Sequence, residues 1–375
     1  MIDDSILSMV AIGLTLLFLG LLNSFQYAAT QLPPDALPRI QLPLTPSGGT
    51  GDNSPLIKPG TIITGALAPL TSWVSSLGHE HPLIGRVWAT DRQEGILPAE
   101  VVSAAAEADI VLVGETHDNP DHHRLQAYLI RQLALKSRHL AVVMEMIGAD
   151  KAEALASYQA ASGANADGLG GALDWDNSGW PAWGLYRPVA EAAFGAGFAI
   201  LPGDAAKAQV QQVGLGGLKV LPESERDRLA VAKTLPAKLN AALTEDIKLS
   251  HCNQLPEANL GQMTDVQRFR DAVLADSLLK AAQKSGGGAI LIAGDGHVRS
   301  DRGVPYYLHT RAPGLKVTTI VLSEVENGVE NPEDAVPRDP DGKPAANFVW
   351  FTARSDRPDQ CEELRKRLQA KTGTG

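Results

Sequence analysis

Cysteine is scarce in this chain. Of its 375 residues only two, Cys252 and Cys361, are cysteines. Neither lies in a Cys-x-x-Cys or Cys/His spacing, which largely excludes a structural zinc site. The pattern favours two free, half-buried thiols. A single disulfide is the alternative if the domain lies in an oxidising compartment.

Positive charge and aromatic residues are also limited. The formal net charge is -10 and no long run of like charge occurs, which argues against nucleic acid as the main partner. Aromatic residues make up only 5%. A cluster of aromatic residues with an Arg can form the walls of a site for a flat apolar ligand that carries acidic groups. Alternatively, such a cluster is a small satellite core without a ligand. The candidates for such walls are clustered: Trp175, Trp180, Trp183, Tyr186 and Arg187.

One long apolar run stands at the N-terminus. Residues 6–22 are apolar or small apart from Ser8 and Thr15. This length is near the lower limit for a membrane-spanning helix and somewhat long for the core of a signal peptide. The sequence therefore predicts that residues 1–30 are a membrane anchor or a signal peptide, with the globular part outside the cytoplasm.

The remaining chain divides by composition. Residues 31–78 include a Pro-rich stretch with Gly, Ser and Thr, and we expect an extended linker there. One α/β domain is expected at 79–356, followed by a C-terminal tail at 357–375.

Apolar runs alternate with helical segments in this domain, which predicts a mainly parallel sheet with helices on both faces. Strands are expected at 82–89, 110–113, 140–144, 198–201, 289–293, 317–322 and 347–352. Helices are expected at 98–108, 121–136, 151–160, 188–196, 223–243 and 264–284, and the Gly-rich residues 163–171 are expected to form a loop.

Acidic and His residues follow several of the expected strands. Glu115 and His117 come after the run at 110–113, Glu145 after 140–144, and His297 after 289–293. The carboxyl ends of parallel strands share one edge of a sheet, where ligands bind in such folds. We therefore predict that these four residues form a catalytic or ligand-binding cluster at the C-terminal edge of the strands.

This set of residue types suits two kinds of site. Imidazole and carboxylate are ligands for transition metals, and a spare carboxylate can deprotonate a metal-bound water. A metal would take Glu115, His117 and His297. Two further His, His122 and His123, fall in the first turn of a helix, where either a site-facing or a solvated surface position is open. On the expected helix 264–284, the polar side chains of three residues share one face: Gln267, Arg270 and Asp271.

The ordered motifs resemble one known family, the ChaN-like haem-binding proteins of the Tiki superfamily. The resemblance runs from about His79 to Val325. It is carried by residues 81–86, Gly114-Glu115-Thr116-His117-Asp118-Asn119-Pro120, His122 and His123, Glu145, Trp180, Tyr186-Arg187-Pro188, Gln267, Arg270-Asp271, Gly294-Asp295-Gly296-His297 and residues 303–305.

The resemblance implies an α/β domain in the bacterial cell envelope that binds haem and is linked to iron acquisition. It also implies a Glu/His site, made here by Glu115, His117, Glu145 and His297. The expected cofactor is haem iron, with candidate contacts His117, His297, Tyr186, Arg187 and Trp183. The alternative is a metal-dependent hydrolase that holds a divalent ion. Haem, the membrane through the N-terminal segment, and a second copy in a homodimer are the expected partners, and nucleic acid is not.

We predict that the apolar N-terminal segment directs the protein to the membrane or across it, because its length suits insertion. The full chain and a form starting at Gly60 are expressed in bacteria and fractionated. We expect only the full chain to leave the cytoplasm. Equal solubility of both forms in the cytoplasm would show that the export prediction is wrong.

Overall fold

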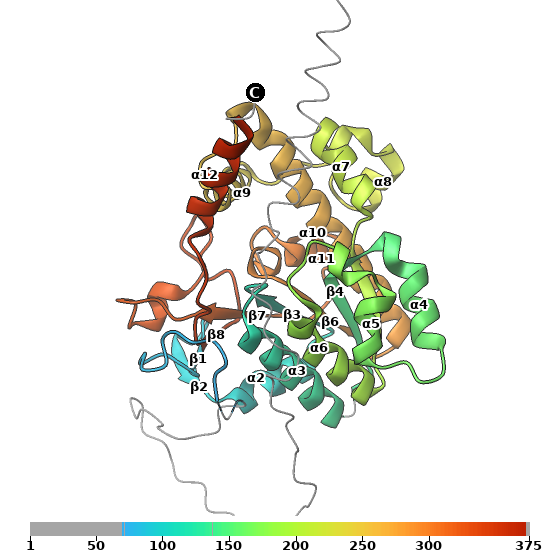
Figure 1. Ribbon diagram of the computed structural model, residues 1–375, viewed down its shortest axis with the longest axis vertical. Helices are drawn as coiled ribbons and strands as arrows, with labels where there is room; N and C mark the ends of the chain where they lie inside the picture. The colour runs from blue at the N-terminus through green and yellow to red at the C-terminus, as the bar shows by residue number, and fades with distance from the viewer. Residues whose placement is uncertain (1–69, 71, 137, 373–375) are drawn as a thin grey trace, which may run out of the picture.

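Six parallel strands form the centre of one eight-stranded sheet (Figure 1). The computed structural model describes residues 70, 72–136 and 138–372. The strand order is β2-β1-β8-β7-β3-β6-β4-β5, with β1 and β2 antiparallel at one end. This confirms the expected α/β class. The strands are β1 (Val87–Ala89), β2 (Glu94–Ile96), β3 (Ile110–Glu115), β4 (Ala141–Gly148), β5 (Ala199–Asp204), β6 (Ala289–Gly294), β7 (Val317–Glu324) and β8 (Phe348–Thr352).

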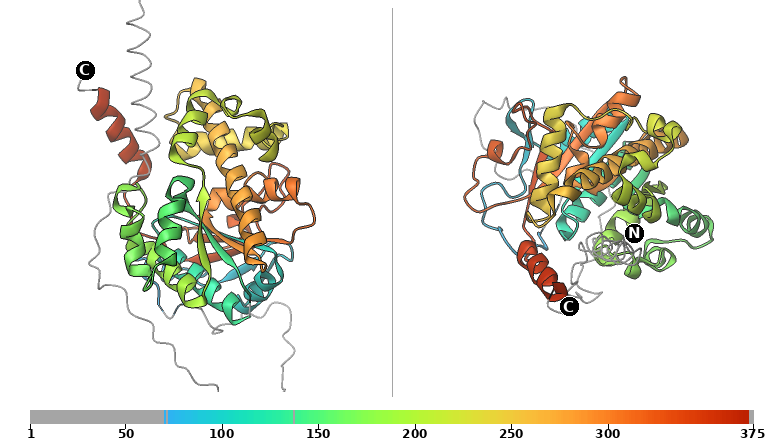
Figure 2. Two further views of the ribbon diagram at one scale, coloured as in Figure 1. Left: turned by 90° about the vertical axis from the view of Figure 1, so that its right-hand side faces the viewer. Right: turned by 90° about the horizontal axis from the view of Figure 1, so that it is seen from above.

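Helices cover both faces of the sheet, as Figure 2 shows in the view turned about the vertical axis. They are α2 (Pro98–Glu107), α3 (Pro120–Leu135), α4 (Ala152–Ala160), α5 (Ala166–Ala172), α6 (Trp183–Ala196), α7 (Lys207–Gly216), α8 (Glu223–Arg228), α9 (Ala237–Ser250), α10 (Glu257–Ser285), α11 (Val304–Arg311) and α12 (Gln360–Thr372). Helices α5, α7, α11 and α12 are additional to those expected from the sequence.

The prediction of a loop at 163–171 is wrong, because most of these residues belong to the helix α5. Asn165 caps this helix by accepting a hydrogen bond from the Gly168 amide at 3.0 Å. A Cβ on Gly170 would lie 2.6 Å from the ring of Trp183, so this glycine permits close packing of α5 on α6. Here the small residues serve contact between helices, which outweighs their weak helix propensity.

Three other expected boundaries also need correction. The helix expected at 223–243 is two helices, α8 and α9, and Pro236 is the residue before α9. The helix expected from Pro188 begins at Trp183, with Pro188 inside it. The strand expected at 82–89 is reduced to the three residues of β1. Proline marks a helix boundary in the first case and not in the second, which is why the sequence misleads here.

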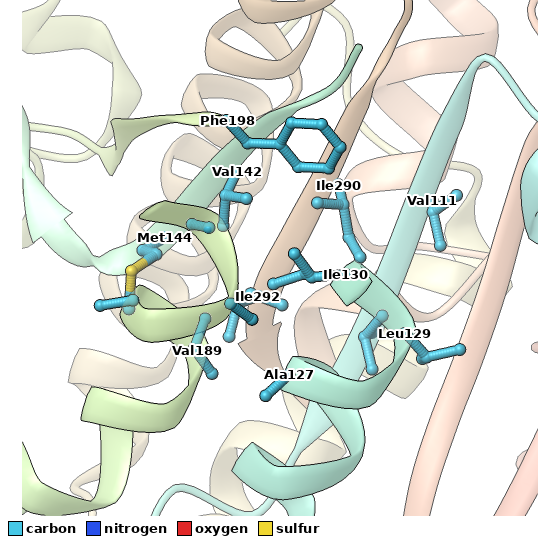
Figure 3. Packing of buried hydrophobic residues seen from close by; sticks show 14 of the residues in the cluster. Val111, Ala127, Leu129, Ile130, Val142, Met144, Val189, Phe198, Ile290 and Ile292 are labelled. Carbon is cyan, nitrogen blue, oxygen red and sulfur yellow. The ribbon is translucent and has the colours of Figure 1, made fainter. Parts of the chain in front are cut away.

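The core lies in two layers, one on each face of the sheet. Alternate residues of a strand point to opposite faces. Val111, Val142 and Ile290 therefore face α3 and α6 in one layer, which Figure 3 shows from close by. Leu112, Val143 and Leu291 face α10 and α11 in the other. Burial of each such side chain contributes about 1.5–3 kcal/mol, so the sheet is fixed from both sides.

The order of the strands determines which strand ends are adjacent at the predicted site. β6 is paired with both β3 and β4, so the ends of these three strands are adjacent. The chain leaves β3 through α3 on one face and leaves β6 through α11 on the other. Such a divergence of connections opens a crevice at the carboxyl ends of the strands, where ligands bind in α/β folds. His117 and His297 lie on its two sides.

Cys252 and Cys361 form a disulfide, with their Cα atoms 5.4 Å apart. The favoured expectation of two free thiols is therefore wrong. Their sequence separation of 109 residues gave no sign of the pairing, which depends on the fold bringing α12 to the end of α9.

Within the described residues, no helix is long and apolar enough to cross a membrane. The N-terminal segment 6–22, expected to insert into or cross the membrane, lies outside those residues.

Gly114 lets the chain after β6 cross close above β3. The residues that follow β6 form a short 3-10 helix, Asp295–Val298, which carries His297. A Cβ on Gly114 would lie 2.5 Å from Cγ2 of Val298 and 3.0 Å from Cα of Asp295. Any side chain at position 114 would therefore push this short helix away from the sheet.

We predict that Gly114→Ala lowers the free energy of unfolding by about 1–3 kcal/mol, because the added methyl group overpacks a buried contact. Gly296→Ala is the matched control, since a Cβ there would have no atom within 4 Å. Urea unfolding monitored by circular dichroism measures both. Equal midpoints for the two variants would contradict the close approach.

Candidate active and ligand-binding site

Glu115 ends the central strand β3 with a fully buried carboxylate. Its Oε1 accepts hydrogen bonds from Nδ1 of His117 at 2.9 Å and from the Tyr186 hydroxyl at 3.1 Å. Its Oε2 accepts from Nε2 of Gln126 at 2.5 Å and lies 3.2 Å from Nδ1 of His123. Burial alone would raise the pKa of Glu115, but the His123 charge and the hydrogen bonds from His117 and His123 outweigh it and lower the pKa. Glu115 is thus an ionised group that orients its neighbours.

His117 presents a free ring nitrogen at this edge. Its Nδ1 is held by Glu115, and its Nε2 has no hydrogen bond to any other described residue. The side chain is 20% exposed, and the Trp180 ring meets it edge-on at a centroid distance of 4.9 Å. Burial acts to lower the pKa of His117, but the hydrogen bond that it donates to Glu115 and the charge of Glu145 raise it overall. Only this imidazole of the cluster offers an unbonded nitrogen.

The two His of the first turn of α3 are both buried, so neither is a surface residue. His122 accepts a hydrogen bond from the Thr116 amide at 2.8 Å through Nδ1, and its Nε2 lies 2.8 Å from the Thr352 hydroxyl. Burial lowers its pKa to about 3, which keeps it neutral. His123 faces the site: besides its contact with Glu115, its Nε2 lies 3.1 Å from the His117 carbonyl oxygen. His122 therefore has a structural role, and His123 supports the site.

Glu145 and His297 form a second buried pair. Oε1 of Glu145 accepts from Nη2 of Arg270 at 2.7 Å and lies 3.2 Å from Nε2 of His297. Oε2 accepts from the Gly294 amide at 2.7 Å. Nδ1 of His297 lies 2.6 Å from Asp271. Burial would lower the pKa of His297, but the charges of Glu145 and Asp271 raise it to about 10. Both nitrogens of His297 are therefore engaged in ion pairs.

The two pairs meet across the end of β6. A Cβ on Gly294 would lie 2.9 Å from Nε2 of His117 and 3.7 Å from Oε2 of Glu145. Glycine at this position leaves room for both side chains to converge. The structure thus brings together all four residues that the sequence placed at the strand ends: Glu115, His117, Glu145 and His297.

The polar face of α10 completes the second pair. Arg270 bridges Glu145 and Asp204, with its Nε 2.7 Å from Oδ2 of Asp204. Nε2 of Gln267 lies 3.0 Å from Nδ1 of His297. The spacing of Gln267, Arg270 and Asp271 in the sequence signalled this face, but not which residues it would meet. His123 and Gln126 are the supporting residues that sequence reasoning did not assign.

Two of the expected cofactor contacts lie away from the cluster. Trp183 donates from Nε1 to the Ala166 carbonyl at 2.9 Å, and Arg187 pairs with Asp167 at 2.9 Å. Of the aromatic segment, Tyr186 and Trp180 contact the Glu115 and His117 pair. The satellite-core interpretation holds for Trp183, while Tyr186 and Trp180 belong to the site.

A cavity of about 320 Å³ lies beside the second pair. This is at the lower end of the range of ligand pockets, about 300–1,000 Å³. Its lining residues come from α9, α10 and the chain that follows β6: Leu243, Asp246, Ile247, Ser250, Gln267, Asp271, Asp295, Gly296, Arg299 and Arg302, with Val321 and Pro337.

The metal site expected on Glu115, His117 and His297 is not assembled. Among the described residues, no group of three or more His, Cys, Asp or Glu is arranged to hold a metal ion. The reason is visible in the contacts, because Glu115 is enclosed by four donors and His297 by two carboxylates.

A family model described as haem-binding uptake, Tiki superfamily, ChaN matches residues 101–308, more than half of the chain. The chain belongs to this family. The matched range contains all four clustered Glu and His residues, from Glu115 to His297.

A solved structure shares the fold, and two others are less similar. The structure titled cofacial heme binding to ChaN of Campylobacter jejuni is 20% identical, with a TM-score of 0.55, over 70% of this chain and 95% of that one. The type III effector HopBA1 is 11% identical, with a TM-score of 0.37, over 68% and 92%. An erythromycin esterase mutant, EreC in its open conformation, is 15% identical, with a TM-score of 0.36, over 72% and 83%. No match was found among curated proteins.

We predict that replacing His297 with Gln destabilises the protein by about 3–5 kcal/mol at pH 6, because it leaves buried carboxylates unpaired. The pKa of His297 is raised to about 10 in the fold, so its stabilising charge is fully present below the ordinary value of 6.5. That contribution is lost as the pH rises towards 10. The difference between wild type and variant should therefore shrink between pH 6 and pH 9.5.

Urea unfolding of both proteins at the two pH values measures this difference. His139→Gln serves as the control, because His139 is exposed and precedes β4 at the opposite edge of the sheet. A difference that stays constant or grows with pH would contradict the buried ion pairs.

Proposed function

We propose that this chain binds haem in the bacterial cell envelope and takes part in haem or iron acquisition. The observation that carries the proposal is the family match, which covers all four clustered Glu and His residues. The solved relative from Campylobacter jejuni, whose title describes cofacial haem binding, supports it through a shared fold.

The residues of the site fit a haem ligand through His117. Haem iron takes an axial nitrogen from His in many proteins, and a metal-bound His usually donates its other N–H to a carboxylate. His117 has this arrangement, with Nδ1 held by Glu115 and Nε2 unbonded. When bound there, haem would supply an iron centre, and His117 would hold it from one side.

Other groups near His117 suit the rest of a porphyrin. Trp180 offers an aromatic surface beside the free nitrogen of His117. Haem also carries carboxylates, which pair well with guanidinium groups. Arg299 lines the cavity beside the second pair, where its guanidinium already binds Asp301 at 3.1 and 3.2 Å. Both features lie at the edge formed by β3 and β6.

Placement in the cell envelope rests on two features. The disulfide between Cys252 and Cys361 suits an oxidising compartment. The apolar segment 6–22 suits export or anchoring. Membrane attachment through that segment and a homodimer stay predictions, which fractionation and light scattering of the full chain test directly.

The metal-dependent hydrolase alternative has no observation in its favour. It requires a metal held by the Glu/His cluster, and the described residues form no such group.

We predict that the protein binds haemin and that His117→Ala weakens binding about ten- to a hundred-fold, because the variant loses the nitrogen that holds the iron. His139→Ala is the matched control, an exposed His at the opposite edge of the sheet. His297→Ala tests the alternative assignment, since the sequence also favoured that residue. Titration of the Soret band measures all four affinities, and added imidazole should restore the spectrum of His117→Ala.

Two outcomes separate the parts of this proposal. Wild-type affinity in His117→Ala would move the iron to another ligand while leaving haem binding intact. Absence of haemin binding by the wild type would overturn the proposed function.

A further inference from the structure

The helix α9 forms one wall of the cavity beside the site, and it lies outside the two main layers of the core. Of the 14 residues of α9, only Leu243 and Ile247 are buried. They pack in a small cluster with Leu235 and Leu255, separate from the two main layers of the core. The same helix contributes Leu243, Asp246, Ile247 and Ser250 to the cavity lining. Partly buried residues of α9, α10 and α11 pack against this cluster: Leu239, Leu260, Met263 and Tyr306. The α9 wall thus depends on one small apolar cluster rather than on the main core.

Polar links and one disulfide add to that packing. Lys238 of α9 pairs with the exposed Asp341, and the Thr244 hydroxyl lies 3.1 Å from the Thr264 hydroxyl of α10. Arg302, from the chain before α11, pairs with Asp246 of α9 with its Nε 2.9 Å from Oδ2. At the end of the helix, Cys252 stands two residues after Ser250 and is bonded to Cys361 in the first turn of α12. Figure 1 shows α12 beside α9 at the top of the molecule. The disulfide is thus the covalent restraint on the end of the wall.

The partner of this bond is itself fixed to the loop of His117. Arg357 lies four residues before Cys361 and binds Asp118 through Nε at 2.8 Å and Nη2 at 2.7 Å. It also donates to Glu324 from Nη1 at 2.7 Å. Asp118 directly follows His117. In contrast, none of the described side chains of α12 is buried, so this helix has little packing of its own.

The chain from Arg357 to Cys361 therefore forms a short strap. One end is held by an ion pair beside His117, and the other by a disulfide at the cavity wall. With the disulfide intact, α9 cannot move away from the edge of the sheet without carrying α12 with it. With the disulfide broken, α9 keeps its small apolar cluster, the Arg302 pair, the exposed Lys238–Asp341 pair and the hydroxyl contact with Thr264, but loses its covalent restraint.

We propose that the Cys252–Cys361 disulfide is a redox latch on the cavity. Its oxidised form holds α9 closed as the wall, and its reduction frees α9 and speeds the exchange of a bound ligand. The proposal rests on the proposed function for the identity of that ligand, taken as haem. It concerns the regulation of the site rather than the residues that bind.

The reductant for this switch is a dithiol. One of its thiolates attacks a sulfur of the disulfide, which breaks the S–S bond, forms a mixed disulfide and releases the other cysteine as a thiolate that takes a proton. The second dithiol sulfur then displaces the bonded cysteine. The products are two protein thiols and one oxidised dithiol. Both cysteines are half-buried, so at least part of each is exposed to solvent.

Hydrogen exchange of the full chain tests the latch without any ligand. Oxidised protein is compared with protein reduced by dithiothreitol, and with the double variant Cys252→Ser, Cys361→Ser. We expect exchange in the α9 peptide, residues 237–250, to rise at least about tenfold on reduction and in the variant. Exchange in β3 and β6 should stay unchanged, which distinguishes local opening from unfolding. Unchanged exchange in α9 of the reduced wild type would overturn the proposal.

Release of haemin gives the second measurement. Loaded protein is mixed with excess apomyoglobin as a haem acceptor, and we expect the off-rate to rise about tenfold on reduction. The double variant should release haemin quickly with or without dithiothreitol, which controls for direct effects of the reductant on iron. Equal off-rates for oxidised and reduced wild type would overturn the latch and leave haem binding intact. Failure of haemin to bind either form would overturn the proposed function, and hydrogen exchange would still decide the latch.

Discussion

Two buried carboxylates on the strands that flank β6 set the requirements for the rest of the site. Glu115 ends β3, and Glu145 lies within β4, directly after the last residue that pairs with β6. An ionised carboxylate cannot stay buried without donors around it. His123 and Gln126 in the first two turns of α3, the Tyr186 hydroxyl and His117 surround Glu115 with donors. Arg270 on the polar face of α10 and His297 supply the partners of Glu145. Leaving either charge unpaired would strongly destabilise the fold. Strands β3 and β4 and helices α3 and α10, which are distant in sequence, are therefore held in one arrangement.

This arrangement divides the clustered residues into supporting and available groups. Glu115, Glu145 and His297 have their polar atoms occupied by neighbours, so they fix geometry. His117 keeps one nitrogen that no described residue occupies, and it lies where β3 and β6 send the chain to opposite faces of the sheet. A preorganised imidazole backed by a carboxylate is a rigid group, because its ring orientation is set before any ligand arrives.

Much of the fold could be predicted from the sequence because its strands are buried on both faces. Runs such as Ile110–Val113 and Ala289–Ala293 are continuously apolar, and Glu or His directly after them signalled the edge with the site. The order of the strands could not be predicted, since it depends on which helix covers which face. The roles within the cluster also required the fold, as His297 and His117 look alike in sequence and differ only in their partners. The disulfide and the packing of Gly170 against Trp183 depend likewise on contacts between distant segments.

The position of β6 has a consequence for how the chain must fold. This strand lies between β3 and β4, yet it follows both of them by more than a third of the length of the chain. A polypeptide emerging from its N-terminus first would present β3 and β4 with no partner between them. Both strands would expose unpaired backbone groups and apolar faces until residues 289–294 arrived, a state prone to association with other chains. The first half of the domain is therefore not an independent folding unit, and formation of the central sheet is a late event that completes the core and the site together.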